Sequence, residues 1–312
     1  MEEKKIVSVV GKNKHRSPVE VAAEMIFTVC AAFGVLAVAS ITLYMIWKGM
    51  PALLEVGIGE ILFGTVWEPS AADPSFGILY VILTSIVGTV LAVLLGVPIG
   101  VLTAVFLTEI APKRLAAVIK PAVELLAGIP SVVFGLLGIY VLTPFLYQLE
   151  LKIFAGSQTH QFTGGSNLLS AILVLAIMIL PTVINISAAA INAVSMHVRS
   201  ASLALGASKI QTIFRVVLPG AKSGIITAVM LGIGRAIGEA MAISLVSGSS
   251  VNLPLPFHSV RFLTTAIVSE MAYSSGLHRK VLFTIGLVLF AFIMLINISL
   301  NRLLKRGAAD ES

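Results

Sequence analysis

Charged residues are scarce in this 312-residue sequence, at 12% of the chain, which is about half the share usual in soluble domains. Apolar residues make up 57%, and the mean hydropathy is +1.02. A disordered chain is excluded, because disorder requires low hydrophobicity. A soluble globule cannot hide this much apolar surface, so the composition indicates a protein whose solvent is the lipid bilayer.

Clustered cysteines, clustered histidines and a basic patch are also missing. The single cysteine, Cys30, lies in an apolar run, and the five histidines are dispersed, so neither a disulfide framework nor a metal site is expected. The net charge of +6 is scattered between apolar blocks, which argues against nucleic-acid binding. No Walker-type phosphate-binding loop and no Ser/His/Asp constellation is present. We therefore expect that the chain is not an enzyme, binds no cofactor itself and takes its energy from a partner.

Six apolar blocks are long enough to cross a membrane, which takes about 20 residues of helix. The predicted spans are approximately 24–47, 76–107, 119–149, 168–194, 224–246 and 281–300. The second and third exceed the thickness of a bilayer, and Pro98 and Pro130 are the expected kink positions. The predicted fold class is an all-α membrane protein with six transmembrane helices.

The distribution of lysine and arginine between the loops predicts the orientation. Fifteen lie in the N-terminal segment, alternate loops and the C-terminal segment, and five lie in the other loops, so we expect both termini in the cytoplasm. The chain is then divided into a cytoplasmic segment, a first transmembrane helix, an external loop, a core domain and a cytoplasmic tail, at residues 1–23, 24–47, 48–75, 76–303 and 304–312.

The segment 196–219 is too polar to span a membrane and has helical periodicity. Apolar residues recur there at steps of four and three, as one helix face requires: Leu203, Ala207, Ile210, Phe214 and Val217. Gly206 interrupts the pattern and Pro219 ends it. The spacing alone fits either an amphipathic helix on the membrane surface or a helix that docks on a partner.

Residues of this segment resemble the EAA loop of ABC-importer permeases. Ser200-Ala201-Ser202 is followed by Gly206 and, after nine residues, by Val216-Val217-Leu218-Pro219. Ser200 stands where the family often has Glu. The resemblance implies a coupling helix that docks on the ATPase subunit, with Gly206 at a turn between two short helices. The coupling residues that it implies are Ser200, Ala201, Ser202, Leu203, Gly206, Ala207, Leu218 and Pro219.

Three further stretches are similar to phosphate ABC-transporter permeases of the PstC type: FGTVWEP at 63–69 with FGIL at 76–79, ELLAGIPSVVFG at 124–135 and LGIGRAIGEAMA at 231–242. The resemblance implies a type I ABC-importer permease in the cytoplasmic (inner) membrane of a prokaryote, which moves inorganic phosphate by alternating access. It also implies a heterodimer with a PstA-like permease, two PstB-like ATPase subunits that bind ATP and Mg, and an external phosphate-binding protein. The alternatives are a permease for another oxyanion and an ion-coupled secondary transporter.

Arg235 and Glu239 are ionisable residues inside an apolar block, where a charge is costly and normally faces a partner or water. They are four residues apart, so on a continuous helix they share a face and can pair. One interpretation is a structural pair beside a packing surface of Gly234 and Gly238. The other, which we favour, is a substrate pathway in which the guanidinium binds an oxyanion and Glu239 weakens its hold.

Residues 128–131 predict a helix break. Gly128 and Pro130 either form a simple packing kink or expose backbone amides and Ser131 to a channel. Glu124 lies about one turn earlier, where it either reaches the cytoplasmic edge of the membrane or takes part in gating. The substrate-pathway residues predicted from the sequence are thus Arg235, Glu239, Gly234, Gly238 and Ser131, and the gating candidates are Glu124, Gly128 and Pro130.

Overall fold

The computed structural model describes residues 18–309, so most of the predicted cytoplasmic segment 1–23 and the last three residues of the predicted tail lie outside the described part. The chain divides into two units, residues 1–47 and 48–312. The described part of the first unit is the beginning of α1 (Pro18–Glu55). This helix extends beyond the predicted span 24–47 at both ends. None of its most apolar window is buried, as is typical of a helix that is hydrophobic all round and meets lipid or another chain.

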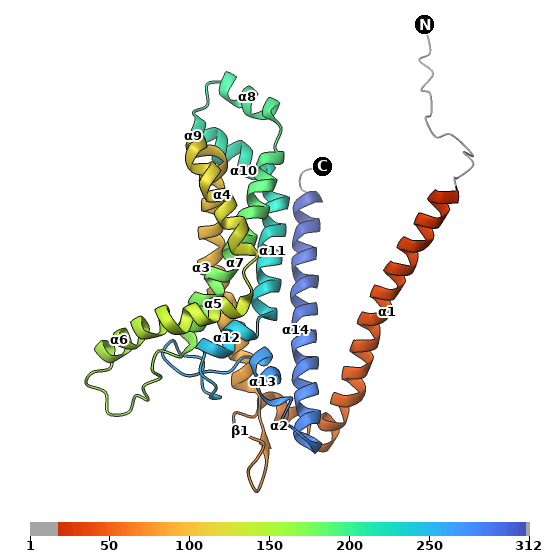
Figure 1. Cartoon of the computed structure of the whole chain (residues 1–312), viewed down its shortest axis with the longest axis vertical. Coiled ribbons are helices and arrows are strands. Elements are labelled where there is room, and N and C mark those ends of the chain that lie inside the picture. The colour runs from red at the N-terminus through yellow and green to blue at the C-terminus, as the bar shows by residue number, and fades with distance from the viewer. Residues whose placement is uncertain (1–17, 310–312) are drawn as a thin grey trace. The chain divides into compact units, whose positions relative to one another are not determined.

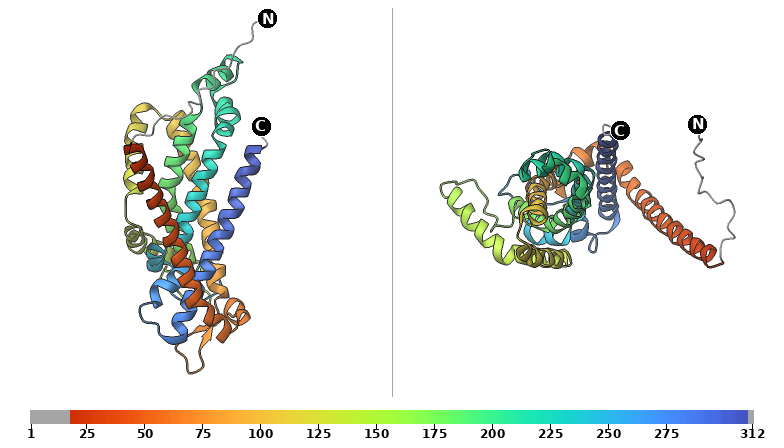
Figure 2. Two further views of the ribbon diagram at one scale, coloured as in Figure 1. Left: turned by 90° about the vertical axis from the view of Figure 1, so that its right-hand side faces the viewer. Right: turned by 90° about the horizontal axis from the view of Figure 1, so that it is seen from above.

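The second unit is built on four helices that lie side by side, α3 (Leu79–Val105), α7 (Leu168–Ala193), α11 (Lys222–Gly238) and α14 (Gly276–Ala309) (Figures 1 and 2). α7 is the central helix, since α3 and α11 both pack along it. α3 is a single helix through Pro98 and continues into the π-helix η1 (Phe106–Ile110). Buried apolar side chains form three clusters along the bundle. The largest is centred on α7 and includes Leu175, Met178 and Ile179.

Short elements gather at the two ends of this bundle (Figure 1). One end, called here the hairpin end, holds α2 (Ile58–Phe63), the strands β1 (Trp67–Glu68) and β2 (Ser75–Phe76), and α13 (Leu263–Glu270). The strands are antiparallel, with Trp67 opposite Phe76. The other end, called the α8 end, holds α8 (Met196–Ala204), α9 (Lys209–Thr212), the π-helix η3 (Ile213–Val217) and α10 (Leu218–Gly220).

Two of the predicted spans are interrupted. The block 119–149 is divided into α4 (Lys113–Ala127), α5 (Ser131–Leu137), the π-helix η2 (Gly138–Leu142) and α6 (Thr143–Ile153), and its candidate span is 131–153. The block 224–246 is divided into α11 and α12 (Met241–Val246). In the described chain, five helices are long and apolar enough to cross a membrane, or up to six if the pair 209–220 and 222–238, bent by 68°, is one span.

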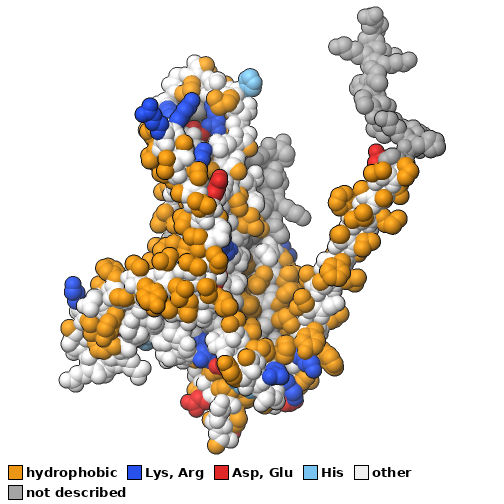
Figure 3. Space-filling view, viewed as in Figure 1, with side chains coloured by type: hydrophobic (Ala, Val, Ile, Leu, Met, Phe, Trp, Pro, Cys, Tyr) orange, Lys and Arg blue, Asp and Glu red, His pale blue; other side chains and the backbone are white. Residues whose placement is uncertain are grey.

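Apolar side chains cover much of the outer surface between the two ends, and basic side chains lie at the α8 end (Figure 3). Four exposed basic residues come from the elements of that end and from α4: Lys113, Arg114, Lys209 and Arg215. An apolar band with basic residues beyond it is the surface expected of a chain that crosses a bilayer.

Candidate substrate pathway and coupling surface

Small residues at every fourth position let α11 approach α7 closely. They are Gly224, Ala228, Gly232 and Ala236. A Cβ on Gly224 would lie 2.3 Å from the Cβ of Ala190, and one on Gly232 would lie 3.1 Å from Cγ2 of Val183. This is the small-residue packing expected between membrane helices.

The predicted packing surface of Gly234 and Gly238 is not used within the described chain. Both glycines are exposed, and a Cβ on either would meet no atom within 4 Å. They lie two residues along from Gly232 and Ala236, which is about 200° around a helix. The open face of α11 that they form with exposed Leu231 is therefore opposite the face packed on α7.

Arg235 and Glu239 do not pair, contrary to the prediction that they could. Arg235 Nη1 donates to Oγ1 of Thr182 on α7, at 3.1 Å. Glu239 Oε1 instead accepts from the backbone N–H of Ala242 at 2.8 Å, and its carbonyl oxygen accepts from Oγ1 of Thr264 at 2.7 Å. The physical reason is that α11 ends at Gly238 and Glu239 is extended, with φ −73° and ψ 132°, so the geometry of a helical pair four residues apart does not exist.

The predicted break at 128–131 is present. α4 ends at Ala127 with Gly128 as its C-cap, and Pro130 is the N-cap of α5 in an extended conformation, φ −57° and ψ 139°. Proline has no N–H and cannot continue the hydrogen-bond pattern of α4. Ser131 is partly buried, whereas Glu124 is exposed on α4.

The two interrupted spans meet. α5 packs on α12, and a Cβ on Gly135 would lie 2.9 Å from Cα of Ala242. Because the backbone N–H of Ala242 also donates to Glu239, α5 and the residues that follow α11 belong to one neighbourhood. Irregular backbone in a membrane protein is tolerated where it is covered by protein or lines a cavity.

The segment 196–219 forms two short helical pieces, as the EAA-loop resemblance implies. The turn between them has Gly206 at φ +85°, a conformation that residues other than glycine adopt at a cost. Ser208 then caps α9 through a capping box with Gln211, and the hydroxyls of Ser202 and Thr212 are 2.9 Å apart. The predicted single helix face is therefore divided by the turn.

The apolar residues of that face have two different surroundings. Val217 and its neighbour Ile213 are buried at the α8 end. Leu203, Ile210 and Phe214 are exposed, as is Leu205, which is 89% exposed. Exposed apolar residues gathered at one end of a molecule mark an interaction surface.

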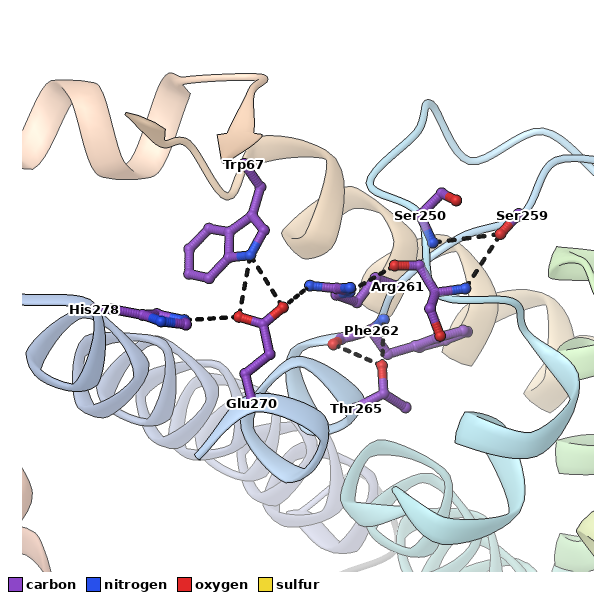
Figure 4. A network of polar contacts seen from close by, with 9 residues as sticks. Trp67, Ser250, Ser259, Arg261, Phe262, Thr265, Glu270 and His278 are labelled. Carbon is purple, nitrogen blue, oxygen red and sulfur yellow. Dashed lines mark hydrogen bonds and ion pairs between the residues drawn. The ribbon is translucent and has the colours of Figure 1, made fainter. Parts of the chain in front are cut away.

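Three polar networks lie outside the predicted pathway, gating and coupling residues. In the first, at the hairpin end, the carboxylate of Glu270 accepts from Trp67 Nε1 at 3.2 Å, pairs with Arg261 and lies 2.7 Å from His278 Nε2 (Figure 4). It joins the hairpin to α13 and α14. Trp67 and Glu270 are 203 residues apart, so no local spacing could reveal this contact.

The second network fastens the loop between α6 and α7. The fully buried carboxylate of Glu150 lies 2.8 Å from His160 Nε2 and accepts from the backbone N–H of Thr163 at 3.0 Å. Thr163 also accepts from Asn167, whose side chain caps the first turn of α7 at Ser170. The third network joins Arg199 of α8 to Glu109 of η1 at the α8 end.

The chain is similar to known permeases over most of its length. The family model described as "Binding-protein-dependent transport system inner membrane component" matches residues 96–309. A probable ABC transporter permease protein, YqgH of Bacillus subtilis, is 40% identical, with 92% of this chain and 93% of that protein covered. The phosphate transport system permease protein PstC of Xylella fastidiosa is 33% identical, with 91% of each chain covered.

The fold is also similar to that of a solved importer. An inward-facing structure of the MetNI methionine ABC transporter matches with a TM-score of 0.53 and 19% identity, over 74% of this chain and 94% of that one. At this identity the likeness concerns the fold, which is the type I ABC-importer permease fold predicted from the sequence. The chain belongs to the family of binding-protein-dependent transport system inner membrane components, as a multi-pass permease subunit of an ABC importer.

Proposed function

We propose that this permease conducts inorganic phosphate across the cytoplasmic membrane of a prokaryote, as a PstC-type subunit. The observation that carries the proposal is Arg235, a guanidinium on an apolar helix whose side-chain hydrogen bond among the described residues goes to the neutral Thr182. Most of its N–H donors are left for a ligand, and a guanidinium suits the oxygens of a tetrahedral oxyanion. PstC relatives at about one-third identity support the choice of phosphate.

In the proposal, the open face of α11 lines the phosphate pathway. Gly234 and Gly238 flank Arg235 in the sequence and leave their side of the helix uncovered within the described chain. In the proposal this face, with Ser131 at the neighbouring break, lines the route together with a PstA-like permease. Glu239 tunes Arg235 through the charge of its carboxylate, which accepts a hydrogen bond from the first turn of α12. Glu124, Gly128 and Pro130 remain the gating candidates.

The energy comes from partners. The family implies an ATPase and a binding protein; in the proposal these are two PstB-like subunits, which hold ATP and Mg, and an external phosphate-binding protein. The chain itself carries out no chemical reaction and holds no cofactor. The exposed apolar residues beside Gly206 dock on the ATPase, at the residues that the EAA-loop resemblance implies. Both termini and the α8 end then lie in the cytoplasm.

Uptake by the reconstituted complex tests the substrate. We expect ATP-dependent accumulation of radiolabelled phosphate in proteoliposomes, inhibited by arsenate, which has the same shape and charge, and little affected by sulfate. Uptake of sulfate or molybdate in place of phosphate would contradict the proposal and would favour the permease for another oxyanion. The chain belongs to a family of ABC-importer permeases, so the alternative considered from the sequence, an ion-coupled secondary transporter, is set aside.

A further inference from the structure

Arg199, on α8, makes three polar contacts with two other elements, the C-terminal end of α7 and η1. Its Nη2 donates to the carbonyl oxygen of Ile191 at 2.6 Å, and its Nε donates to that of Val194 at 3.2 Å. Its Nη1 forms an ion pair with Glu109 of η1. The side chains of Arg199 and Glu109 are only 13% and 11% exposed, so solvent screens this pair less than it screens a pair on the surface.

The two carbonyl groups belong to the C-terminal end of α7. The last carbonyls of a helix have no partner inside the helix, and basic side chains commonly satisfy them. A guanidinium is planar and holds its donors in a fixed fork. A single side chain therefore fixes α8 against α7 and against η1, the continuation of α3.

Among the described residues, Arg199 provides the side-chain hydrogen bonds that join α8 to these membrane helices. The other side-chain bond of α8 to a different element, between the hydroxyls of Ser202 and Thr212, stays within the segment 196–219. α7 packs along both α3 and α11, and α11 carries Arg235. A displacement of α8 is thus transmitted through the hydrogen bonds and ion pair of Arg199 to α7 and η1, and through α7 to α11, which carries the candidate pathway residue Arg235.

We propose that Arg199, with Glu109, is the positioning residue that makes α8 move together with α3 and α7, so that its loss separates ATP hydrolysis from transport. This inference rests on the proposed function in one respect, the docking of the segment 196–219 on the ATPase. The contacts of Arg199 are all with residues of the permease. Its proposed role is therefore to pass a movement of α8 to α3 and α7 after the ATPase has docked. It does not depend on which oxyanion is carried.

The experiment compares Arg199→Gln and Glu109→Gln with Arg199→Lys in the purified complex with its ATPase. The glutamine variants should assemble normally and hydrolyse ATP, while phosphate taken up per ATP hydrolysed falls by about tenfold, in line with the loss of a charge-assisted hydrogen bond. Arg199→Lys keeps the ion pair with Glu109 but lacks the forked donors of a guanidinium. Its ratio of phosphate taken up to ATP hydrolysed should therefore lie between those of the wild type and the glutamine variants. Arg114→Gln, which removes an exposed arginine on α4, is the matched control and should behave as wild type.

A second measurement does not require phosphate. With the exposed Cys30 replaced by Ser, spin labels at His197→Cys on α8 and Lys113→Cys at the start of α4, both exposed positions, should give one narrow distance distribution with and without ATP when Arg199 is present. Arg199→Gln should broaden it. An unchanged distribution, or a loss of uptake exactly proportional to the loss of assembled complex, would overturn the inference. Failure of the unmutated complex to take up phosphate would count against the substrate, and the distance measurement would still decide the role of Arg199.

Discussion

Arg235 is the residue whose surroundings bear most directly on transport. A charge inside a membrane span is costly unless it has a partner or water, and the structure gives Arg235 a hydroxyl, Thr182, in place of the acid expected from the sequence. Glu239 is engaged with the N-terminal end of α12. The positive charge on α11 is therefore not neutralised by a direct ion pair with Glu239, as the proposed pathway requires.

Substitution of Arg235 should separate assembly from uptake. We expect Arg235→Ala to assemble and to lose ATP-dependent phosphate uptake, and Arg235→Lys to keep a fraction of it, because lysine retains the charge and loses the planar fork. Glu239→Gln is the companion variant, since its amide oxygen can still accept from Ala242. Because the two residues do not pair, the double exchange Arg235→Glu with Glu239→Arg should not restore uptake. Restoration to near the wild-type rate would refute the pathway role.

The sequence identifies Arg235 and Glu239 for a sound reason, since an ionisable residue inside an apolar block is conspicuous. Their pairing could not be judged, because it required α11 to continue past Gly238, and hydropathy does not mark the end of a helix inside an apolar run. Arg199 and Glu109 are 90 residues apart, so the contact depends on the packing of α7 against α3. No spacing along the chain predicts it.

At the scale of elements, α11 has a packed face that tolerates only small residues, at Gly232, and an open face with room for a side chain, at Gly234. Gly232→Leu should destabilise the permease by about 1–3 kcal/mol, because its side chain would enter the packed seam with Val183. Gly234→Leu should leave the stability of the chain unchanged, because its face is open, and should reduce assembly with the second permease or uptake. Thermal unfolding in detergent and phosphate uptake measure the two effects. Equal destabilisation by both variants would mean that the open face is covered.

The turn at Gly206 gives a second prediction for an element. Its positive φ makes Gly206→Val unfavourable by about 1–2 kcal/mol, although a Cβ there meets no atom within 4 Å, so the cost is conformational and not steric. We expect the variant to insert and to lose co-purification with the ATPase or coupled hydrolysis. Gly206→Asn should be milder, since Asn tolerates this region. Gly220→Ala, whose Cβ would be 3.6 Å from Val194, is the control, and equal behaviour of Gly206→Val and this control would argue against the docking assignment.

The elements themselves are only partly predictable. Length and hydropathy locate most spans, and glycine with proline locates the break before α5, because both act through the local backbone. The sequence predicts one span at 119–149 in place of the end of α4 and α5, because the apolar side of α4 adjoins the next apolar run without a polar gap. The amphipathic pattern through 203–217 indicates helix, and Gly206, which interrupts it, lies at the turn that the EAA-loop resemblance implies.

At the scale of the whole molecule, the second unit brings together basic residues that are distant in the sequence. α4, which begins with Lys113 and Arg114, lies at the same end as α9 and η3, which carry Lys209 and Arg215. The long apolar helices α5–η2–α6 and α7 separate the two groups along the chain. Lysine and arginine are enriched on the cytoplasmic side of membrane proteins. This arrangement favours the orientation of the proposed function, in which the α8 end lies in the cytoplasm.

Labelling with a membrane-impermeant thiol reagent tests that orientation. Cys30 is exposed, so it is first replaced by Ser. In intact cells, Ala72→Cys in the hairpin should react, because it is exposed at the hairpin end. Arg215→Cys at the α8 end should react only after the membrane is opened, and its labelling then serves as the control for its accessibility. The opposite pattern would place the EAA-like segment outside the cell, where no ATP-hydrolysing subunit could drive it, and would contradict both the charge-based orientation and the proposed coupling.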